Sequence, residues 1–400
     1  MLSGKNILLA VTGGIAAYKM ADVASMLVKQ HADVHVVMTE HATKFITAET
    51  FQILTKNKVF VDVFDEDADP ESVPHIDLGT SADCILVAPA TANIIGKIAN
   101  GIADDMVSTV VLPARCPILI APSMNVYMFE NMIVQDNISK LKKFGYTIIE
   151  PDDGHLACGY DGKGKLPQPS VLVEEVLLAA AKEKDFKGKK VLVNAGPTQE
   201  SIDPVRYITN HSSGKMGYAV ARVAAMRGAE VTLVSGPTAL STPAGVKRID
   251  ITSAEDMYNA MTANSDNSDI IIMSAAVADY KPSVVADNKI KKSDSDMAIP
   301  LNRTKDILKT IGEKKRKDQV IVGFSMETEN LIENSREKLT KKNADMICAN
   351  SLTTEGAGYQ VDTNIVTLIT KDEEISLPLM SKDEVADSIL DKAIEIINKL

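Results

Sequence analysis

The chain has 400 residues, of which 45% are hydrophobic and 24% charged, and its net charge is −11. This length corresponds to roughly two to three domains of about 150 residues, and the composition is ordinary for a globular protein. The negative charge argues against a general nucleic-acid or membrane-binding surface, which would need a basic face.

The cysteines are few and widely spaced. Cys84, Cys116, Cys158 and Cys348 form no CxxC pair, so we expect neither structural zinc nor a disulfide framework. The apolar run from Ile7 to Val11 is too short for a signal peptide, and no run approaches about 20 apolar residues. We therefore expect a reduced, cytoplasmic protein.

The chain begins twice with the same pattern. Residues 4–14 (GKNILLAVTGG) and residues 188–196 (GKKVLVNAG) each pass from Gly-Lys through a short apolar run into a glycine turn. This pattern is typical of the first buried parallel strand of an α/β domain. The lysine-rich residues 179–190 indicate the end of a helix and a solvated link. We predict two doubly wound α/β domains, residues 1–187 and 188–400.

The first half opens with a predicted strand, a glycine turn at residues 12–14 and a helix over residues 15–30. A strand, a glycine turn and a helix N-terminus together form a potential anion site. The turn is not GxGxxG, and the second strand, residues 33–39, ends in Thr39 instead of the acidic residue expected for NAD. The hydroxyls of Thr12 and Thr39 suit a phosphate monoester better, although a plain turn with a capping threonine is an equal alternative.

Two further predicted strands, residues 84–91 and 117–125, both end in Ala-Pro turns, and residues 92–112 between them are predicted helical. The turns carry small polar side chains, namely Thr91, Asn93, Ser123 and Asn125. Ligands of α/β sheets bind at the carboxyl ends of strands. The pattern predicts a crevice there for a planar ligand that forms hydrogen bonds.

Several strings of the first half resemble the flavin-dependent cysteine decarboxylases, and most closely the phosphopantothenoylcysteine decarboxylases. They are APATANIIGKIANGIADDM, APSMNVYM and LACGYDGKG. The resemblance covers residues 5–180 and implies a flavodoxin-like domain that holds FMN. The residues that it places near FMN are Gly13, Gly14, Thr39, Ala90, Thr91 and Asn93.

The resemblance also implies catalytic roles. Oxidation of the substrate's thiol carbon by FMN would give a thioaldehyde, which can accept the electrons left by departing CO2. His75 would accept a proton, Asn125 would hold the carboxylate, and Cys158 would donate the final proton. From the residues alone, His75 follows a proline in an acidic loop, where a surface or capping histidine is the commoner explanation.

Cys158 lies in a glycine-rich segment that we expect to be a mobile flap closing over the substrate. We expect His155 of the same segment to be structural. Where relatives carry Arg-Met and an acid, this chain has Lys165, Leu166 and Gln168. Lysine lacks the bidentate geometry of arginine, so the details of substrate binding are open.

The second half also alternates strands and helices, which predicts a second doubly wound sheet. After the strand at residues 190–195, Ser212-Ser213-Gly214 marks the start of a helix, and the next strand ends in Ser235 without the acid expected for NAD. Further predicted strands cover residues 269–282, 320–328 and 344–350. A strand pair near residues 364–370 and a helix over residues 383–400 follow.

The second half is rich in lysines that could bind an anion. Lys289, Lys291 and Lys292 form one cluster, and Lys338 and Lys342 lie one helical turn apart. Like charges at that spacing cost about 0.2 to 0.5 kcal/mol without an anion, but a solvated lysine-rich face is an alternative explanation. The chain contains no GxxxxGK[ST] sequence, which excludes an ordinary P-loop.

The strings AGPTQE, TNHSSGKMG, SAAVADYKP and KIKK resemble phosphopantothenate-cysteine ligases. The order decarboxylase then ligase is similar to that of the bifunctional bacterial coenzyme A biosynthesis proteins. The resemblance implies a Rossmann-like nucleotide-binding domain that activates 4'-phosphopantothenate with CTP and Mg2+, after which the amine of cysteine displaces CMP. It implies that Asn210 stabilises the acyl-cytidylate; a helix-capping asparagine is the alternative.

The residues that this resemblance places around CTP are Met273, Ser274, Ala275, Asp279, Lys289, Lys305, Asp306, Ile307, Leu308, Phe324, Lys338 and Lys342. No residue is assigned as a metal ligand.

The favoured hypothesis is a bifunctional enzyme whose second half makes phosphopantothenoylcysteine and whose first half decarboxylates it to 4'-phosphopantetheine. The family suggests trimeric decarboxylase and dimeric ligase contacts, with FMN sites completed by neighbouring copies. A flavodoxin-like electron carrier fused to a nucleotide-sensing module is the rival hypothesis, and it would not need Asn125, Cys158 or Asn210. An NAD dehydrogenase is disfavoured by the absent fingerprint and by Thr39 and Ser235.

Overall fold

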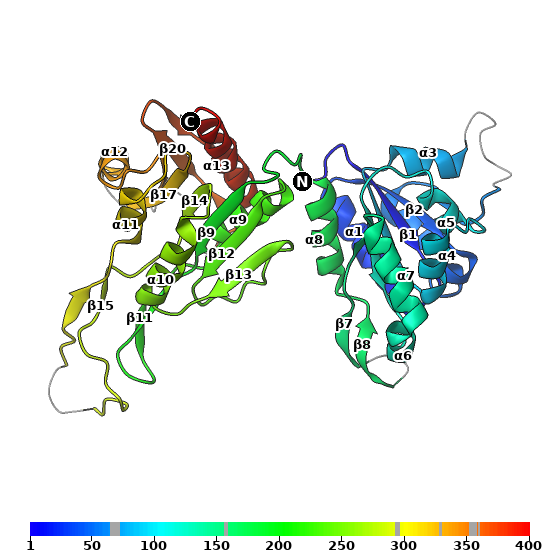
Figure 1. Cartoon of the computed structure of the whole chain (residues 1–400), viewed down its shortest axis with the longest axis horizontal. Coiled ribbons are helices and arrows are strands. Elements are labelled where there is room, and N and C mark those ends of the chain that lie inside the picture. Colours follow the sequence, from blue (N-terminus) through cyan, green and yellow to red (C-terminus); the bar gives the residue numbers. More distant parts are fainter. Residues whose placement is uncertain (65–72, 156–158, 293–296, 328–329, 352–357, 359–360) are drawn as a thin grey trace. The chain divides into compact units, whose positions relative to one another are not determined.

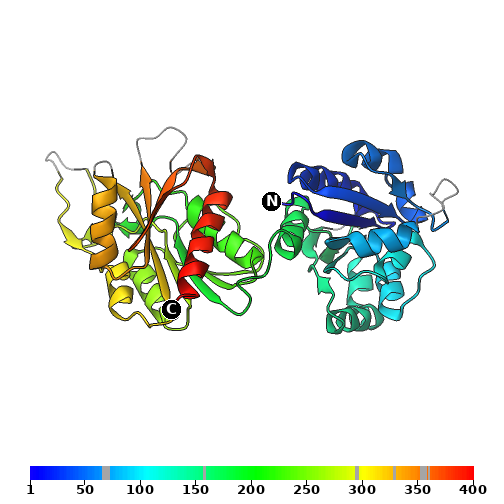
Figure 2. The same ribbon diagram turned by 90° about the horizontal axis from the view of Figure 1, so that it is seen from above.

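The computed structural model of the chain describes residues 1–64, 73–155, 159–292, 297–327, 330–351, 358 and 361–400. The chain divides into two compact units, Met1–Glu183 and Lys184–Leu400 (Figure 1). The predicted boundary after residue 187 lies close to this division. Both units contain a central sheet with helices on both of its faces (Figure 2), so the mixed α/β prediction is confirmed.

The main sheet of unit 1 is parallel and has the order β3-β2-β1-β4-β5-β6. Its strands are β1 (Asn6–Val11), β2 (Asp33–Met38), β3 (Val59–Phe60), β4 (Cys84–Ala90), β5 (Ile118–Pro122) and β6 (Thr147–Ile148). Residues 7–11 of β1 and all of β4 are buried. A continuous apolar run of this kind is expected where helices cover both faces of a parallel sheet.

The helices of unit 1 are shorter than the sequence predicts. Residues 15–30 divide into the 3-10 helix η1 (Ile15–Lys19) and α1 (Met20–Lys29). Residues 92–112 divide into α4 (Ala92–Asn100) and α5 (Met106–Val111). Gly101 ends α4 with a φ of 69°, and Asp105 begins α5 with a capping box. Hydrophobic periodicity continues through both breaks, so it does not locate them.

The remaining elements of unit 1 cover the sheet or extend from it. They are η2 (Glu40–Lys44), α2 (Ala48–Thr55), α3 (Pro74–Ser81), α6 (Val126–Glu130), α7 (Met132–Lys143), α8 (Pro169–Ala180) and the antiparallel hairpin of β7 (Asp152–His155) and β8 (Asp161–Lys165).

The main sheet of unit 2 has the order β13-β12-β9-β14-β17-β18-β20-β21, in which only β20 and β21 pair antiparallel to their neighbours. Its strands are β9 (Lys190–Ala195), β12 (Glu230–Ser235), β13 (Val246–Asp250), β14 (Ile270–Met273), β17 (Val320–Glu327), β18 (Met346–Ser351), β20 (Val366–Thr370) and β21 (Glu374–Ser376). Sequence reasoning missed β13, a half-exposed edge strand without a buried apolar run.

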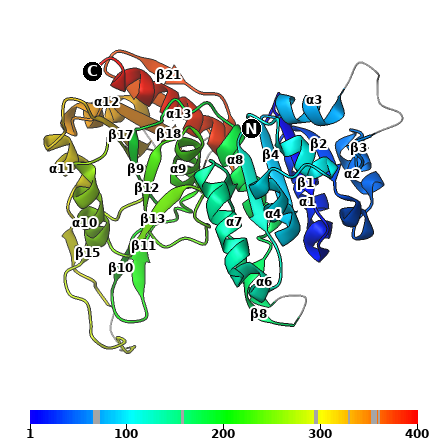
Figure 3. The same ribbon diagram turned by 45° about the vertical axis from the view of Figure 1, so that its right-hand side comes forward.

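Helices α9 (Lys215–Met226) and α13 (Lys382–Ile397) pack side by side (Figure 3). A core that joins β9, β12, β14 and β17 to α10 and α11 contains Leu192, Val234, Met257, Met261, Ile271, Met273, Ile307, Leu308, Ile311 and Ile321. The other elements are α10 (Ala254–Ser265), α11 (Ile307–Glu313), α12 (Leu331–Lys341), β10 (Gln199–Ser201), β11 (Tyr207–Thr209), β15 (Tyr280–Pro282), β16 (Leu301–Arg303), β19 (Thr363–Asn364) and β22 (Met380–Ser381).

In both sheets the first strand is central. The second and third strands lie on one side of it, and the fourth lies on the other. The direction in which successive strands are added to the sheet therefore reverses next to β1 in unit 1 and next to β9 in unit 2. Ligands of open α/β sheets bind at such a switch point, outside the carboxyl ends of the strands.

Within the described ranges, no helix combines the length and the apolar character needed to cross a bilayer.

The packing of α9 against the switch point of unit 2 leads to a stability prediction. A Cβ atom at Gly217 of α9 would lie 2.4 Å from Ser274 Oγ and 2.6 Å from Ala195 Cβ. We expect Gly217→Ala to lower the free energy of unfolding by about 1 to 3 kcal/mol, because the helix must move off the sheet. Chemical unfolding followed by circular dichroism measures the change.

The matched control is Gly96→Ala, which also changes a glycine inside a helix. At Gly96 of α4 the nearest atom to an added Cβ is 3.8 Å away, so this change should be neutral or stabilise by about 0.5 to 1 kcal/mol. Equal stability of Gly217→Ala and the wild type would contradict the packing argument.

Candidate active sites

The switch point of unit 1 is fixed by Thr12, the residue that follows β1. Its side chain is 1% exposed. Its Oγ1 donates to the Pro89 carbonyl oxygen at 2.5 Å and accepts from the Thr91 amide at 3.3 Å. Thr91 Oγ1 in turn accepts from the Ile94 amide and caps α4. The idea that Thr12 offers its hydroxyl to a phosphate is therefore wrong, because that hydroxyl is buried and bonded within the protein.

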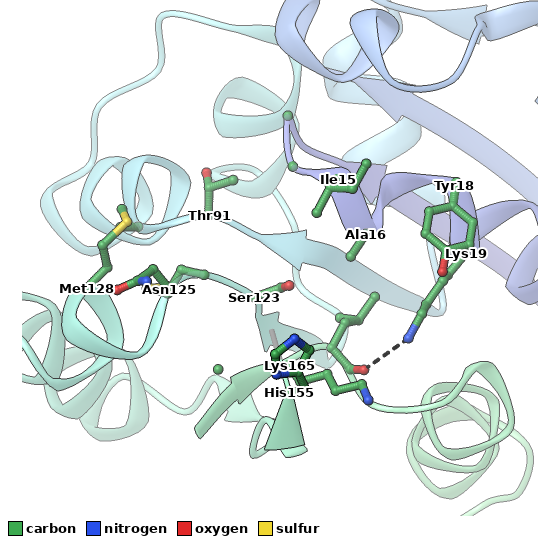
Figure 4. A pocket seen from close by; sticks show the side chains of 16 residues that line it. Ile15, Ala16, Tyr18, Lys19, Thr91, Ser123, Asn125, Met128, His155 and Lys165 are labelled. Atoms are coloured by element: carbon green, nitrogen blue, oxygen red, sulfur yellow. Dashed lines mark hydrogen bonds between the residues drawn. The ribbon is translucent and has the colours of Figure 1, made fainter. Parts of the chain in front are cut away.

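A cavity of about 500 Å³, here called the first cavity, lies beside this turn (Figure 4). The residues that line it are Gly13, Gly14, Ile15, Ala16, Tyr18, Lys19, Thr91, Ala92, Ser123, Met124, Asn125, Met128, His155, Gly164, Lys165 and Leu166. They include the predicted Gly13, Gly14, Thr91 and Asn125. Segments from the ends of β1, β4 and β5 thus meet in one cavity, as the strand-end pattern predicted.

Asn125 lies on one side of the first cavity beside Met128, and Tyr18 and Lys19 lie on the other (Figure 4). The Asn125 Oδ1 atom accepts from the Tyr127 amide at 2.9 Å and caps α6. The oxygen of this amide group accepts hydrogen bonds, and its nitrogen donates them.

The lining of the first cavity contains two lysines and a histidine, and no carboxylate: Lys19, Lys165 and His155. The Lys19 ammonium donates to the Leu166 carbonyl oxygen at 3.4 Å, the dashed line of Figure 4. His155 Nδ1 lies 3.1 Å from Asp161 Oδ1. The cavity therefore favours an anionic ligand in a protein of net charge −11. Sequence reasoning missed Lys19, although its place in the helix that follows the glycine turn was a usable signal.

The predicted glycine-rich flap has two β-strand arms, β7 and β8. Cβ atoms added at Gly162 and Gly164 would lie 2.7 Å from Val126 Cγ2 and 2.4 Å from the Met124 carbonyl oxygen, respectively. These glycines let the hairpin pack directly on the loop that carries Asn125. In the segment that departs from relatives, Lys165 lines the cavity and Leu166 is buried.

Other predicted residues of unit 1 lie outside the lining of the first cavity. Thr39 Oγ1 accepts from the Ala42 amide at 3.3 Å and caps η2, which matches the capping alternative. Ala90 is buried and Asn93 is exposed. His75 lies in α3, and its Nδ1 atom is buried without a hydrogen-bond partner among the described residues. Cys158 lies outside the described residues.

In unit 2, Asn194, the second-last residue of β9, has a role comparable to that of Thr12 in unit 1. Its side chain is 1% exposed, and its Oδ1 atom accepts from the Ala275 amide at 2.8 Å. Its carbonyl oxygen accepts from Ser274 Oγ at 2.6 Å. Nearby, Thr198 Oγ1 accepts from the Ala278 amide at 3.0 Å. The end of β9 therefore fixes the loop after β14, which carries much of the predicted nucleotide site.

A cavity of about 700 Å³, the second cavity, lies at this loop. The residues that line it are Met273, Ala275, Val277, Ala278, Asp279, Tyr280, Arg303, Thr304, Lys305, Asp306, Ile307, Leu308, Lys309, Phe324, Lys338 and Lys342. All the residues predicted around CTP are present except Ser274 and Lys289. Segments separated by up to 69 positions in the sequence, from Met273 to Lys342, thus converge on one cavity.

The lysines of the second cavity are held by nearby oxygens. Lys338 Nζ donates to the Phe324 carbonyl oxygen at 2.7 Å, and Lys305 Nζ donates to Glu255 Oε1 at 2.7 Å. Lys342 pairs with Asp306. Burial opposes ionisation of Asp306, but the Lys342 ammonium and the Lys309 amide outweigh it and lower the pKa of this carboxyl. Lys338 and Lys342 therefore line a cavity and do not form the solvated face that was the alternative.

A third cavity of about 310 Å³ shares Ala275, Val277, Asp279, Phe324 and Lys338 with the second, so the two adjoin. Its other lining residues are Asn210, Ser212, Ser213, Gly214, Lys215, Met216, Gly217, Ser274, Ala276, Ser325, Met326, Asn350, Gly358, Asn364 and Lys382. It therefore contains the predicted Asn210 and Ser274. Sequence reasoning assigned no role to Lys215, although this residue lies in the string TNHSSGKMG. It also missed Asn350, Asn364 and Lys382, which lie outside the quoted motifs.

Asn210 does not cap a helix. Its Oδ1 atom accepts from the neighbouring His211 amide at 2.9 Å, whereas the residue before α9 is Gly214. The capping alternative is therefore wrong. Lys289 is exposed and lies outside the lining of the second and third cavities. Within the described ranges, no three His, Cys, Asp or Glu side chains gather in a way that could hold a metal ion.

Ser235, at the end of β12, is fully buried, and its hydroxyl interacts with Tyr218 Oη at 2.8 Å. It occupies the strand end at which NAD-binding domains place an acidic ribose ligand. The end of β12 therefore does not support the hypothesis of a nicotinamide dehydrogenase.

Comparisons with known proteins match both units. Residues 1–180 match the family model described as Flavoprotein, and residues 186–397 match that of the DNA/pantothenate metabolism flavoprotein C-terminal domain. The coenzyme A biosynthesis bifunctional protein CoaBC of Bacillus subtilis is 50% identical over 394 residues, which cover 98% of this chain and 97% of that protein. The chain belongs to the CoaBC family.

Other CoaBC proteins are similar along their whole length. That of Escherichia coli K12 is 40% identical over 396 residues, covering 98% of this chain and 97% of its own. A crystal structure of the C-terminal domain of a CoaBC protein is 47% identical and covers 55% of this chain and all of its own, with a TM-score of 0.47. Membership of the CoaBC family identifies the chain as a bifunctional enzyme of coenzyme A biosynthesis, so the electron-carrier hypothesis is wrong.

The buried lysine of the third cavity leads to a pH prediction. Lys382 is 6% exposed and donates to the carbonyl oxygens of Gly358 and Val361. Burial, and then the charge of Lys215, lower the pKa of Lys382 to about 8, against the opposing effect of Asp362. The unfolded chain therefore binds more protons than the folded chain between about pH 8 and 10.5, and stability rises with pH there.

We expect the stability of the wild type relative to Lys382→Met to rise between pH 8 and 10.5, by up to about 3 kcal/mol. Urea unfolding of both proteins across this range measures the difference and removes the contribution of other titrating groups. A difference that is flat or falls with pH would contradict the lowered pKa.

Proposed function

We propose that unit 2 joins cysteine to 4'-phosphopantothenate through an acyl-cytidylate, and that unit 1 decarboxylates the product to 4'-phosphopantetheine with FMN. The observation that carries the proposal is the pair of adjoining cavities in unit 2. One is lined by almost all the residues predicted around CTP, and the other contains Asn210. The order of the strands supports the finer description of the units as flavodoxin-like and Rossmann-like.

The residues of the first cavity fit FMN. The glycine turn at Gly13 and Gly14 lets backbone approach a ligand closely, and the basic lining without a carboxylate suits a phosphate. We propose that Gly13, Gly14 and Thr91 hold the cofactor, which supplies a two-electron acceptor for the substrate when bound. The cofactor would also lie near Thr39, Ala90 and Asn93, which are not in the lining of the first cavity.

Three side chains of unit 1 would handle the substrate. Asn125 would donate through its side-chain nitrogen to the carboxylate that leaves as CO2 and hold it in place. His75 would accept a proton, and Cys158 would donate the last one. Lys19, Lys165 and His155 would attract the anionic substrate into the cavity.

His75 is absent from the lining of the first cavity in a single chain, whereas its Nδ1 atom is buried without a partner among the described residues. We infer that a neighbouring copy supplies this histidine in a trimeric decarboxylase, and that the ligase units form dimers. A molecular mass equal to that of a single chain, measured by light scattering, would contradict this arrangement.

In unit 2 a carboxylate must become an electrophile, which requires a good leaving group. CTP in the second cavity would supply it, with Lys338 and Lys342 near the triphosphate, and Mg2+ would help to neutralise the phosphate charge. Asp279 and Asp306 are the carboxylates of this cavity, and Asp306 keeps Lys342 in position before CTP binds. Lys289 would reach the triphosphate from the exposed segment that follows β15. Asn210, in the adjoining cavity, would donate to the acyl-cytidylate during amine attack.

The role of Asn125 is tested by Asn125→Asp. Aspartate still caps α6, but it replaces the amide donor with a negative charge that repels the substrate carboxylate. We expect CO2 release from 4'-phosphopantothenoylcysteine to fall by about a hundredfold or more, with the flavin absorbance retained.

The matched control is Asn131→Asp. Asn131 caps α7 in the same way, because its Oδ1 atom accepts from the Ile133 amide at 3.0 Å, and it does not line the first cavity. Activity of Asn125→Asp equal to that of Asn131→Asp would show that Asn125 only caps a helix.

The role of Asn210 is tested by Asn210→Asp, which keeps the acceptor for the His211 amide and loses the amide donor. We expect CTP-dependent pyrophosphate release to continue while amide formation falls by about a hundredfold. Both products are measured with 4'-phosphopantothenate, cysteine and Mg2+, once with CTP and once with ATP.

Asn259→Asp, on the exposed face of α10, is the control for the added charge. An amide yield from Asn210→Asp equal to that of this control would exclude the proposed role. Pyrophosphate release with ATP as fast as with CTP would contradict the nucleotide preference.

A further inference from the structure

Among the described residues of unit 2, Asn350 combines a place in the lining of a cavity with a buried side-chain atom that has no hydrogen bond. Asn350, at the end of β18, is 5% exposed and lines the third cavity. Its Oδ1 atom is buried and has no hydrogen-bond partner within the described part of the chain. A buried acceptor of this kind is costly to leave unpaired, so folded proteins rarely keep one unless a ligand or water satisfies it.

Two other buried polar side chains of the same cavity are bonded within the protein. Asn364 is 2% exposed, and its Oδ1 atom accepts from the Ile365 amide at 3.1 Å. Lys382 donates to two backbone carbonyl oxygens. The unpaired oxygen of Asn350 is therefore not a general property of this cavity's buried polar residues.

The charges around the third cavity indicate what it binds. Lys215, Lys338 and Lys382 line it together with one carboxylate, Asp279. The N-terminus of α9, which follows Gly214, also lies in the lining, and helix N-termini favour anions. An anionic substrate is favoured here over the ammonium group of cysteine. For such a substrate, the group that donates to Asn350 would be a neutral donor on an anionic molecule.

The substrate proposed for unit 2 has this composition. 4'-Phosphopantothenate carries a phosphate and a carboxylate, and the arm between them carries two neutral donors, a hydroxyl group and an amide N–H. We propose that Asn350 is a specificity-determining residue of the ligase unit, whose Oδ1 atom accepts a hydrogen bond from the hydroxyl or the amide N–H of the pantothenate arm. This inference rests on the proposed ligase function of unit 2.

If Asn350 has this role, the ligase unit discriminates against substrate analogues that lack the hydrogen-bond donor. A site whose buried acceptor is satisfied only by the substrate rejects an analogue without that donor, because the acceptor then stays unpaired. An analogue of the same charge and length would still satisfy the lysines and reach CTP, so charge alone does not provide this selection.

The experiment compares three substrates with the full chain in CTP-dependent amide formation: 4'-phosphopantothenate, its analogue without the hydroxyl group, and its analogue with an ester in place of the amide. We expect the wild type to disfavour one analogue by about tenfold or more in kcat/KM. The disfavoured analogue identifies the donor. In Asn350→Leu this discrimination should disappear, while Asn350→Asp, which keeps an acceptor, should retain it.

Ser335→Ala is the matched control. Ser335 Oγ is also buried without a partner among the described residues, but it lines neither the second nor the third cavity. This variant should discriminate as the wild type does. If Asn350→Leu does not fold, as judged by its melting temperature, Asn350→Ala gives the same comparison.

Discrimination by the folded Asn350→Leu or Asn350→Ala protein equal to that of the wild type would overturn the proposal. So would a wild type that accepts both analogues as well as the natural substrate. A wild type that forms no amide from 4'-phosphopantothenate would instead overturn the proposed function of unit 2, so the two failures are distinguishable.

Discussion

In each unit, one buried polar side chain lies at or near the end of the first strand of the sheet, β1 or β9. It fixes the turn that follows the neighbouring parallel strand, β4 or β14. Thr12 bonds to both Pro89 and Thr91 in unit 1, and Asn194 bonds to Ala275 in unit 2. Both side chains are 1% exposed, so their hydrogen bonds form where water competes little. Each candidate site begins at that turn, because the strand order opens the sheet at the same point.

The candidate sites in the first and third cavities carry more positive than negative side chains, whereas the whole chain has a negative net charge. The net charge is −11, yet the first cavity has a basic lining and the third has three lysines and one carboxylate. In the second cavity, Asp306 forms an ion pair with Lys342. Local charge of this kind attracts small anions, while the acidic remainder of the surface disfavours nucleic acid.

The sequence predicted the strands best where an apolar run is buried on both faces, as in Ile7–Val11 and Ile270–Met273. It missed β13, because a half-exposed edge strand has no such run. Motifs identified most of the second cavity, since its residues occur in a few continuous strings. They did not identify Asn350 or Lys382, which reach the third cavity from β18 and α13 and acquire their environment only through folding.

The central claim is that the two units catalyse consecutive reactions, so that the product of unit 2 is the substrate of unit 1. The most direct measurement follows the full chain with 4'-phosphopantothenate, CTP, Mg2+ and cysteine labelled in its carboxyl carbon. The account predicts labelled CO2 in an amount equal to the pyrophosphate released, and none when CTP is omitted. Labelled CO2 without CTP, or sustained pyrophosphate and amide formation without CO2, would contradict it.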